Sequence, residues 1–474
     1  PRGEGWVFVE LADDDPGRLS ERADALLAAS GCLDGRVVTD PEITKALWQI
    51  RSDGAGLAGV SLDAPAYAGW EDAAVPPARL GDYLRDFDAL LVEHGLHGLP
   101  YGHFGDGCVH CRIDFPLTSP GGADAYRAFI LDAARLAASY GGSMSGEHGD
   151  GRARSELLPL MYSAEAIALF AQVKAIFDPG DLLNPGVLVD PAPLDAQVRP
   201  AEARRSPLWT QDARFAEDVH RCTGVGKCVA SERAGDVMCP SYQATRDEKD
   251  STRGRARVLQ EMINGTLVTG GWRAPEVREA LELCLSCKGC SRDCPTGTDM
   301  AAYKSRVLFE AYRGRLRPMN HYALGLLPRW GRLVQSVPGL PALANAVLQG
   351  PLSGLVKRVA GLDAARKGMP RFARGSNRRK VAADLATKDA TGKPVLLWVD
   401  SFSDAFESDA VAAMAAVLIE AGYAPRMAER KACCGLTWIS TGQLDGARRE
   451  IVGALDVLHP YVAQGIPIVG TEPS

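Results

Sequence analysis

Four cysteines in the second half of the chain have a spacing typical of iron–sulfur ligation. Cys284, Cys287, Cys290 and Cys294 form the run C-x2-C-x2-C-x3-C, and Pro295 follows directly. In bacterial ferredoxin-type loops, the first three thiolates of such a run bind one cluster and the fourth binds another. A zinc site rarely needs a third closely spaced cysteine, because zinc takes four ligands in all. The run therefore predicts a [4Fe–4S] cluster.

An upstream stretch repeats this loop in incomplete form. Cys222 and Cys228 flank Val225, which stands where a middle cysteine would be and cannot bind iron. The two-cluster arrangement gives one complete set of ligands, Cys284, Cys287, Cys290 and Cys239, and a second set of three, Cys222, Cys228 and Cys294. The second site is expected to hold a three-iron cluster, to use a non-cysteine ligand such as the nearby His220, or to be empty.

Two glycine-rich loops in the first half of the chain carry histidines and a carboxylate. His103 and His110 flank a Gly-Asp-Gly turn, which predicts that they lie on facing arms of a hairpin. Glu147 and His148 precede a second Gly-Asp-Gly turn. Two imidazoles and one carboxylate suit a divalent metal with an open coordination position. A single histidine would more often be structural, but two such loops together favour a metal site.

The elements that must position these loops follow an α+β pattern over residues 1–195. A strand is expected at 6–11, and helices are expected at 16–29, 41–51 and 124–140, where apolar residues recur with helical period. We expect a substrate domain in which helices cover one side of an antiparallel sheet.

Three further regions are expected after a polar, proline-containing link. They are a helical, ferredoxin-like iron–sulfur domain at 208–316, a helical connector at 317–392, and the start of an α/β unit at 393–474. The last region carries the adjacent pair Cys433 and Cys434. Two buried thiols before a helix would be the structural explanation of this pair.

Composition narrows the class of protein. The 474 residues carry a net charge of −6, which gives no electrostatic reason to expect nucleic acid as a partner. Because no apolar run is long enough to cross a membrane, we expect no membrane span, and we expect no signal peptide. The 12 cysteines are clustered, which favours cluster ligation in a reducing, cytoplasmic compartment over disulfides. Basic residues dotted through the connector leave contact with the inner membrane face as an alternative.

The first region resembles the C-terminal half of FAD-linked oxidases of the vanillyl-alcohol oxidase type. That group includes D-lactate dehydrogenases, the glycolate oxidase flavin subunit and D-2-hydroxyglutarate dehydrogenases. The stretches that carry the resemblance are 47–51, 72–76, 103–110, 146–152 and 178–186. The resemblance implies that His103, His110 and Glu147 bind a divalent metal, usually zinc, and that His148 is the catalytic base.

The same resemblance implies the residues that bind substrate and flavin. Arg51 matches the arginine that holds the substrate carboxylate, while Asn184 and Gly146 match positions near FAD. Arg112 is assigned to the substrate, although relatives often have asparagine there. Trp70 stands where some relatives have a substrate-binding lysine. These departures leave the hydroxy acid open without changing the reaction class.

The whole chain resembles part of the large bacterial D-2-hydroxyglutarate dehydrogenases that join flavin and iron–sulfur modules. The pair Cys433-Cys434 with Gly435 resembles the start of a CCG module, whose further cysteines would follow residue 474. Both ends look like cuts through a longer polypeptide. The resemblance implies that most of the FAD is held by a domain that precedes this region, so we expect either an N-terminal FAD domain or a separate chain that supplies it. The expected activity is oxidation of a D-2-hydroxy acid, either D-2-hydroxyglutarate or D-lactate.

Electrons are then expected to leave through the cluster to a quinone, an electron-transfer flavoprotein or a similar carrier, in a protein that forms a homo-oligomer. The alternative function is an iron–sulfur subunit that relays electrons without a catalytic site of its own.

Overall fold

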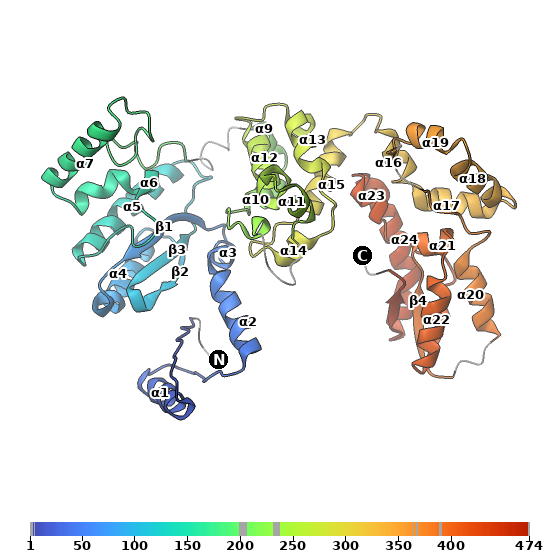
Figure 1. Ribbon diagram of the computed structural model, residues 1–474, viewed down its shortest axis with the longest axis horizontal. Coiled ribbons are helices and arrows are strands. Elements are labelled where there is room, and N and C mark those ends of the chain that lie inside the picture. Colours follow the sequence, from blue (N-terminus) through green and yellow to red (C-terminus); the bar gives the residue numbers. More distant parts are fainter. Residues whose placement is uncertain are drawn as a thin grey trace. The chain divides into compact units, whose positions relative to one another are not determined.

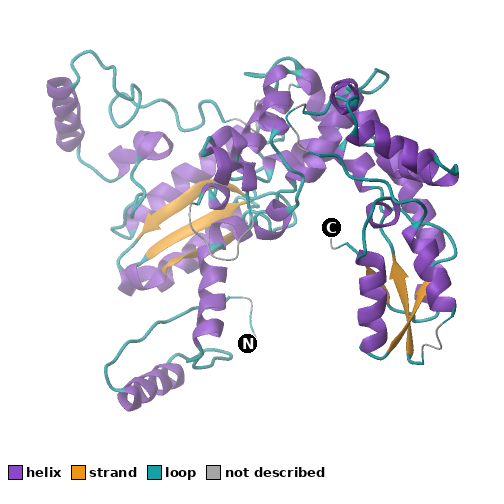
Figure 2. Cartoon of the chain, turned by 45° about the vertical axis from the view of Figure 1, so that its right-hand side comes forward, coloured by secondary structure: helices purple, strands orange, loops and turns teal. Residues whose placement is uncertain are grey.

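The computed structural model describes all residues except 1, 2, 4, 199–205, 231–237, 364, 366, 367, 388–390, 473 and 474. The chain divides into two compact units, Pro1–Glu202 and Ala203–Ser474, and each is described by itself. Figure 2 shows that each unit contains one small sheet among many helices. Among the described residues, no helix combines the length and apolar character needed to cross a bilayer. The finer domain boundaries given above stay predictions.

The first unit is built on a three-stranded antiparallel sheet of order β1-β3-β2. Its strands are β1 (Tyr67–Ala74), β2 (Gly98–His103) and β3 (Cys108–Ile113), and its helices are α1 (Pro16–Ala29), α2 (Pro41–Ser52), α3 (Gly54–Ala58), α4 (Leu80–Glu93), α5 (Gly122–Ser139), α6 (Gly151–Arg154) and α7 (Ala164–Phe177). Helix α5 packs on β1 and on α4, while α3 lies against β2 and β3. The expected α+β fold and the three expected helices are confirmed.

The core of this unit explains why β3 is the central strand. Every residue of β3 is buried. Ile113 packs with Phe87 of α4 and Phe129 of α5 in one apolar cluster, and all three side chains are almost fully enclosed. Burial of an aromatic or aliphatic side chain of this size contributes about 1.5–3 kcal/mol. The sheet is therefore a firm base for side chains on β3.

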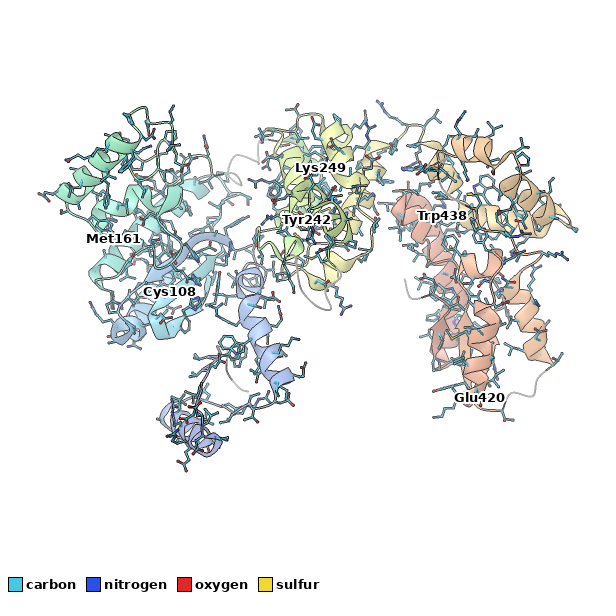
Figure 3. All side chains as sticks on the ribbon, viewed as in Figure 1. Cys108, Met161, Tyr242, Lys249, Glu420 and Trp438 are labelled. Atoms are coloured by element: carbon cyan, nitrogen blue, oxygen red, sulfur yellow. The ribbon has the colours of Figure 1, made fainter. Side chains whose placement is uncertain are left out.

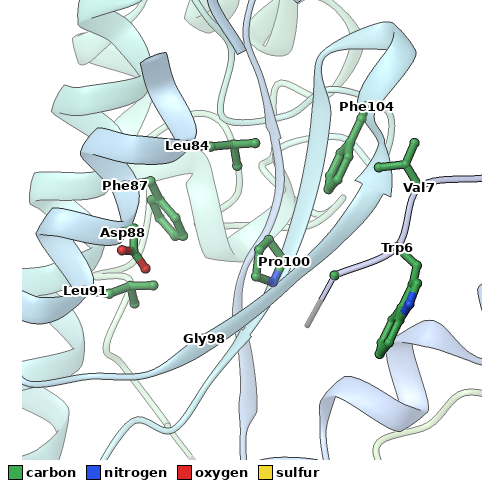
Figure 4. Close-up of a pocket in the computed structure, with 10 residues that line it drawn as sticks. Trp6, Val7, Leu84, Phe87, Asp88, Leu91, Gly98, Pro100 and Phe104 are labelled. Carbon is green, nitrogen blue, oxygen red and sulfur yellow. The ribbon is translucent and has the colours of Figure 1, made fainter. Parts of the chain in front are cut away.

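The strand expected at 6–11 is wrong. These residues have no regular secondary structure and pair with no neighbouring strand among the described residues, and Trp6 and Val7 are 59% and 69% exposed. Figure 4 shows them across a hollow from Pro100 and Phe104. The hollow measures about 300 Å³ and has a largely apolar lining. The segment has a strand-like run of apolar residues, but a strand also requires a hydrogen-bonded partner.

The second unit begins with a helical bundle around the cysteines. Its helices are α9 (Pro207–Gln211), α10 (Ala213–His220), α11 (Pro240–Thr245), α12 (Thr252–Asn264), α13 (Pro275–Glu282), α14 (Gly289–Asp293) and α15 (Met300–Ala311). Helix α12 is central, because Leu259, Met262 and Ile263 are fully buried against α10, α13 and α15. Ser251 caps α12 by accepting a hydrogen bond from the Gly254 amide at 2.9 Å, as expected for a helix start after serine.

The remainder of this unit is a helical connector and a parallel sheet. The connector helices are α16 (Met319–Ala323), α17 (Leu327–Ser336), α18 (Leu340–Gln349), α19 (Ser353–Val359) and α20 (Asn377–Ala386). The sheet has the order β5-β4-β6, with β4 (Lys393–Trp398), β5 (Tyr423–Met427) and β6 (Ile468–Gly470), and its helices are α21 (Ser401–Ala405), α22 (Ala410–Glu420), α23 (Leu436–Ser440) and α24 (Leu444–Ala463).

Alternate residues of β4 enter two different cores. Val395 and Leu397 pack with α20 and α22, whereas Leu396 packs with α24 on the opposite face. A parallel strand covered by helices on both faces is typical of α/β folds. The expected start of an α/β unit at 393 is therefore confirmed as a fold.

Candidate functional site

The hairpin formed by β2 and β3 positions two of the predicted metal ligands. Tyr101 pairs with His110 and His103 pairs with Cys108 in the antiparallel register, so both histidines lie near the turn. Gly107 closes this turn with a positive φ of 74°. A Cβ atom on Gly107 would lie 1.9 Å from the Val75 carbonyl oxygen, so only glycine fits. The expected hairpin with histidines on facing arms is confirmed.

Asp72 of β1 holds the second loop against the sheet. Its buried carboxylate accepts hydrogen bonds from the amides of Glu147 at 3.1 Å and His148 at 2.8 Å, and from the Ser145 hydroxyl at 3.1 Å. Gly146 donates its amide to the Asp72 carbonyl at 2.8 Å. A Cβ on Gly146 would lie 3.0 Å from the Ala74 side chain, so glycine permits this close approach. The loop is thereby fixed beside the hairpin.

The two loops bring three imidazoles to one carboxylate oxygen. Glu147 Oε1 lies 3.4 Å from His103 Nε2, 3.2 Å from His110 Nε2 and 3.5 Å from His148 Nε2. The rings of His110 and His148 are stacked, with centroids 5.1 Å apart and an interplanar angle of 5°. The His110 Nδ1–H group donates a hydrogen bond to the Glu71 carbonyl oxygen. The lone pair of Nε2 is then available to bind a metal. The geometry suits ligation by His103, His110 and Glu147.

A second ligand set overlaps the first. Donor atoms of Asp72, Cys108, His110 and Glu147 all lie within 4.8 Å of one another. Figure 3 labels Cys108, which begins β3. Burial raises the pKa of the Cys108 thiol to about 11, and the carboxylates of Asp72, Glu147 and Asp106 add to this shift. The role of Asp72 was not predicted from the sequence, where its signal was the pair of acidic residues Glu71 and Asp72 within β1.

Arg51 and His148 lie beside this group. Arg51 Nη2 is 3.2 Å from His103 Nε2, which brings α2 to the end of the hairpin. His148 Nδ1 is 3.7 Å from Asp72 Oδ1. A carboxylate behind an imidazole orients the ring and stabilises its protonated form. His148 thus lies between two acidic side chains, Asp72 and Glu147.

Three other residues singled out in the sequence make no described contact with the group of histidines around Glu147. Arg112 is buried two positions after His110 on β3, and its Nε lies 2.7 Å from Glu71 Oε1. Trp70 belongs to the apolar core and donates to the Tyr83 hydroxyl at 3.0 Å. Asn184 lies in an exposed loop with a φ of 50°, and none of its described contacts links it to the histidines.

Four cysteines of the second unit surround one cavity. Cys239, Cys284, Cys287 and Cys290 line it together with the first turn of α12. Burial alone would raise the pKa of the Cys239 thiol, but a hydrogen bond with Ser241 and the charge of Arg255 bring that pKa below its usual value. Arg255 Nη1 lies 3.3 Å from the Cys239 sulfur. A cavity with four sulfur donors and a nearby cation suits an anionic thiolate-bound cluster.

Three other cysteines surround a separate cavity. Cys222, Cys228 and Cys294 line it, and Val225 lines it with them. The Arg253 amide donates to the Cys228 sulfur at 3.3 Å. The two sets of cysteines are those expected from the spacing. His220 is not among the lining residues, and its Nδ1 donates to the Ala216 carbonyl at 2.7 Å within α10.

The adjacent cysteines of the last region lie in a cleft at the carboxyl ends of β4 and β6. Trp398, Asp400, Cys433, Cys434 and Thr471 are among the lining residues. The Cys433 pKa is lowered to about 6, since the Cys434 thiol and the Ser401 hydroxyl donate hydrogen bonds to its sulfur. Ligands of α/β sheets usually bind at this edge.

Two stretches of the chain match family models of redox domains. Residues 1–188 match the C-terminal domain of FAD linked oxidases. Residues 200–298 match the 4Fe-4S dicluster domain. The predicted joining of a flavin-oxidase domain to an iron–sulfur domain is confirmed, and FAD and iron–sulfur clusters are the cofactors that these domains imply.

The chain is homologous along nearly its full length to bacterial D-2-hydroxyglutarate dehydrogenases. It is 26% identical to that of Escherichia coli (strain K12) over 527 residues, which cover 99% of this chain and 51% of the relative. It is 27% identical to that of Pseudomonas putida with the same coverage. The D-lactate dehydrogenase of Archaeoglobus fulgidus is 41% identical over 118 residues, 25% of this chain and 26% of the relative. The chain spans about half the length of the bacterial relatives that it matches throughout.

Proposed function

We propose that this chain belongs to an enzyme that oxidises a D-2-hydroxy acid to the 2-oxo acid and passes the electrons on through a [4Fe–4S] cluster. D-2-hydroxyglutarate is the first substrate to test and D-lactate the second, since relatives carry both names. The observation that supports this proposal is the convergence of His103, His110 and His148 on one Glu147 oxygen. An electron relay alone has no need of such a group.

The proposed metal site uses His103, His110 and Glu147, with zinc as the first candidate. The donor set fits, because two Nε2 atoms lie 3.4 and 3.2 Å from the same carboxylate oxygen. Imidazole nitrogen and carboxylate oxygen are the ligands of catalytic zinc sites that keep one position open. When bound, the metal would supply a Lewis acid and the flavin a two-electron acceptor.

The chain's own residues bind the substrate and move its proton. Arg51 would hold the substrate carboxylate in its planar guanidinium fork. His148 would accept the hydroxyl proton at a ring nitrogen, and the adjacent carboxylate of Asp72 would stabilise the imidazolium that forms. Arg112, buried on the same strand as His110, would stand behind the substrate pocket with Glu71. Most of the FAD would be held by a domain outside this segment, with Gly146 and Asn184 near it.

A cluster bound in the four-cysteine cavity would carry electrons from the flavin to an external acceptor. A hydride carries two electrons, whereas a [4Fe–4S] cluster transfers one at a time. The cluster that accepts the electrons of the reduced flavin one at a time would be held by Cys239, Cys284, Cys287 and Cys290. We propose a quinone or an electron-transfer flavoprotein as the acceptor.

The test uses the full-length protein under anaerobic conditions. Addition of D-2-hydroxyglutarate or D-lactate should bleach the flavin absorbance. The His148→Ala variant should lose this bleaching while keeping its cluster absorbance, with His97→Ala at an exposed site as the control. If no 2-hydroxy acid reduces the flavin, the proposal is wrong. If His148→Ala reduces it normally, the relay function becomes the better explanation.

A further inference from the structure

We propose that the cavity lined by Cys222, Cys228 and Cys294 holds a three-iron cluster, [3Fe–4S]. The matched domain type implies two four-iron clusters. An all-cysteine cubane needs four thiolates, and this cavity supplies three. The role of such a cluster in electron transfer rests on the proposed function, but its composition does not.

The count of thiolates is fixed by the sequence. The chain has seven cysteines between Cys222 and Cys294, including both ends. Four of them line the first cavity and the other three line the second. Cys433 and Cys434 lie in their own cleft elsewhere in this unit. No cysteine of the unit is left over for the fourth corner.

The loop position that would supply a fourth cysteine to the second cavity carries a side chain that cannot bind iron. Val225 stands midway between Cys222 and Cys228 and lines the cavity with them. In the matching loop of the first cavity, Cys287 stands midway between Cys284 and Cys290. The two loops therefore differ at the one position that decides between three and four cysteine ligands.

His220, the non-cysteine ligand suggested by the sequence, makes its described contacts elsewhere. His220 donates Nδ1 to the Ala216 carbonyl of its own helix and packs edge-on against Trp209, with ring centroids 5.0 Å apart. It does not line the cavity. Among the hydroxyls that do, Thr296 lies 3.2 Å from the Cys294 sulfur and 3.3 Å from the Thr298 hydroxyl. Its hydrogen bonds are thus already made.

One lining group points to a sulfide-containing occupant. The Thr223 hydroxyl oxygen is buried and has no hydrogen-bond partner within the described residues. A buried hydroxyl without a hydrogen-bond partner is energetically unfavourable. An inorganic sulfide of a cluster is an acceptor that would satisfy it. The Arg253 amide at the start of α12 already donates to the Cys228 sulfur, as expected around an anionic cluster.

The two cavities share the first turn of α12. Thr252 lines both of them, while Arg253 lines the three-cysteine cavity and Arg255 lines the four-cysteine cavity. Two one-electron centres on either side of a single helical turn form a direct route for electrons. A three-iron cluster at one end would take up one electron as it changes from its oxidised to its reduced state.

Iron analysis and electron paramagnetic resonance test the proposal on anaerobically purified full-length protein. We expect about seven iron atoms per chain, beyond any iron in the metal site, from one four-iron and one three-iron cluster. The oxidised protein should show the signal of a three-iron cluster, since an oxidised four-iron cluster of this type is silent. The signal should persist after addition of ferrous ion and reductant followed by reoxidation, which separates it from a damaged four-iron cluster.

A single substitution gives the sharper test. Val225→Cys should complete the second ligand set, raise the iron content to about eight atoms per chain and abolish the oxidised-state signal. Val225→Ala is the matched control and should keep the wild-type signal. About four iron atoms and no signal in the wild-type protein would mean that the cavity is empty and would overturn the proposal.

About eight iron atoms in wild type, again without the signal, would mean that a non-cysteine ligand completes a cubane and would overturn it equally. If Val225→Cys fails to fold, the wild-type iron content and spectrum decide. Because these spectra need no turnover, a protein with the signal but without hydroxy-acid oxidation would contradict the proposed function alone.

Discussion

The four-cysteine cavity and the histidine–glutamate site are built in different ways. Three of the four cysteines come from one short loop, 284–290, and Cys239 joins them from the start of α11. The histidine–glutamate site instead combines side chains from α2, β2, β3 and the loop after α5. One site depends on local spacing, and the other depends on the register of a sheet.

This difference decides which perturbations should matter to each site. The register Tyr101–His110 and the bridge Ala74–Ser143 bring the two glycine-rich loops together. The cysteine loop needs no sheet, and its support is the buried helix α12. We therefore expect substitutions at the two sites to have separable effects on flavin reduction and on cluster content.

Removal of one cluster ligand should have the largest effect. Cys284→Ala leaves the first cavity with three thiolates, so turnover with an external acceptor should fall by a factor on the order of 100 or more. Flavin bleaching by substrate should remain, because the histidine–glutamate site is untouched. Steady-state turnover and anaerobic bleaching measure the two effects, and Cys32→Ser, at an exposed free cysteine, is the control. Loss of bleaching in Cys284→Ala would show that the sites are not separable.

The buried pair under Cys239 should control the stability of the cysteine region. Arg255 and Asp250 are 1% and 2% exposed, with Arg255 Nη2 3.6 Å from Asp250 Oδ1. Arg255→Leu leaves the buried carboxylate without its cation, which typically costs about 3–5 kcal/mol. Urea unfolding followed by cluster absorbance measures this change.

Lys249→Ala is the matched control, because it removes an exposed pair with Glu279 at 2.6 Å from the same segment. Such a surface pair contributes about 0–1 kcal/mol. Equal destabilisation by the two variants would contradict the structural role assigned to Arg255.

The sequence predicted the local site almost completely and the sheet-borne site in part. The cysteine spacing separates the two ligand sets, because a loop that wraps a cluster fixes which thiolates can reach it. The position of Asp72 could not be predicted in this way. Its role depends on pairing of β1 with β3 and on the loop at 143–148 folding back onto it, and neither contact has a sequence period. The strand predicted at 6–11 was wrong for the same reason, because strand pairing depends on tertiary contacts that have no sequence period.

Asp72→Asn tests this missed residue. The asparagine side chain has the same size but lacks the negative charge of the carboxylate that accepts hydrogen bonds from the Glu147 and His148 amides. Loss of a supporting carboxylate behind metal ligands typically reduces activity or metal affinity about 10–100-fold. Flavin reduction rates and metal content measure the effect, while cluster absorbance should be unchanged. The control is Asp82→Asn, at an exposed residue that pairs only with Arg85 among the charged groups described. Wild-type rates in Asp72→Asn would exclude a positioning role.

The smallest expected effect concerns the adjacent cysteines Cys433 and Cys434. They lie in a cleft at the carboxyl ends of parallel strands, unlike the residues of the other two sites. The Cys433 sulfur accepts hydrogen bonds from the Cys434 thiol, the Ser401 hydroxyl and the Gly435 amide, which outweigh its burial and lower its pKa to about 6. A lowered pKa keeps the thiolate form as the pH falls, until the pH passes the new value. Iodoacetamide labelling of Cys433 should therefore slow much less between pH 8 and pH 6 than labelling of a thiol with a pKa of about 8.5, which slows by about two orders of magnitude.

Mass spectrometry of the full-length protein assigns the labelled residue, with free cysteine as the reference thiol. Ser401→Ala should move the profile of Cys433 toward that of the reference, because one of its hydrogen-bond donors is removed. A Cys433 profile parallel to free cysteine in the unsubstituted protein would mean that the cleft does not stabilise the thiolate. A stabilised Cys433 thiolate would distinguish this cleft, at the ends of parallel strands, from the cysteine loop of the four-cysteine cavity. In that loop, burial raises the pKa of Cys290 to about 11.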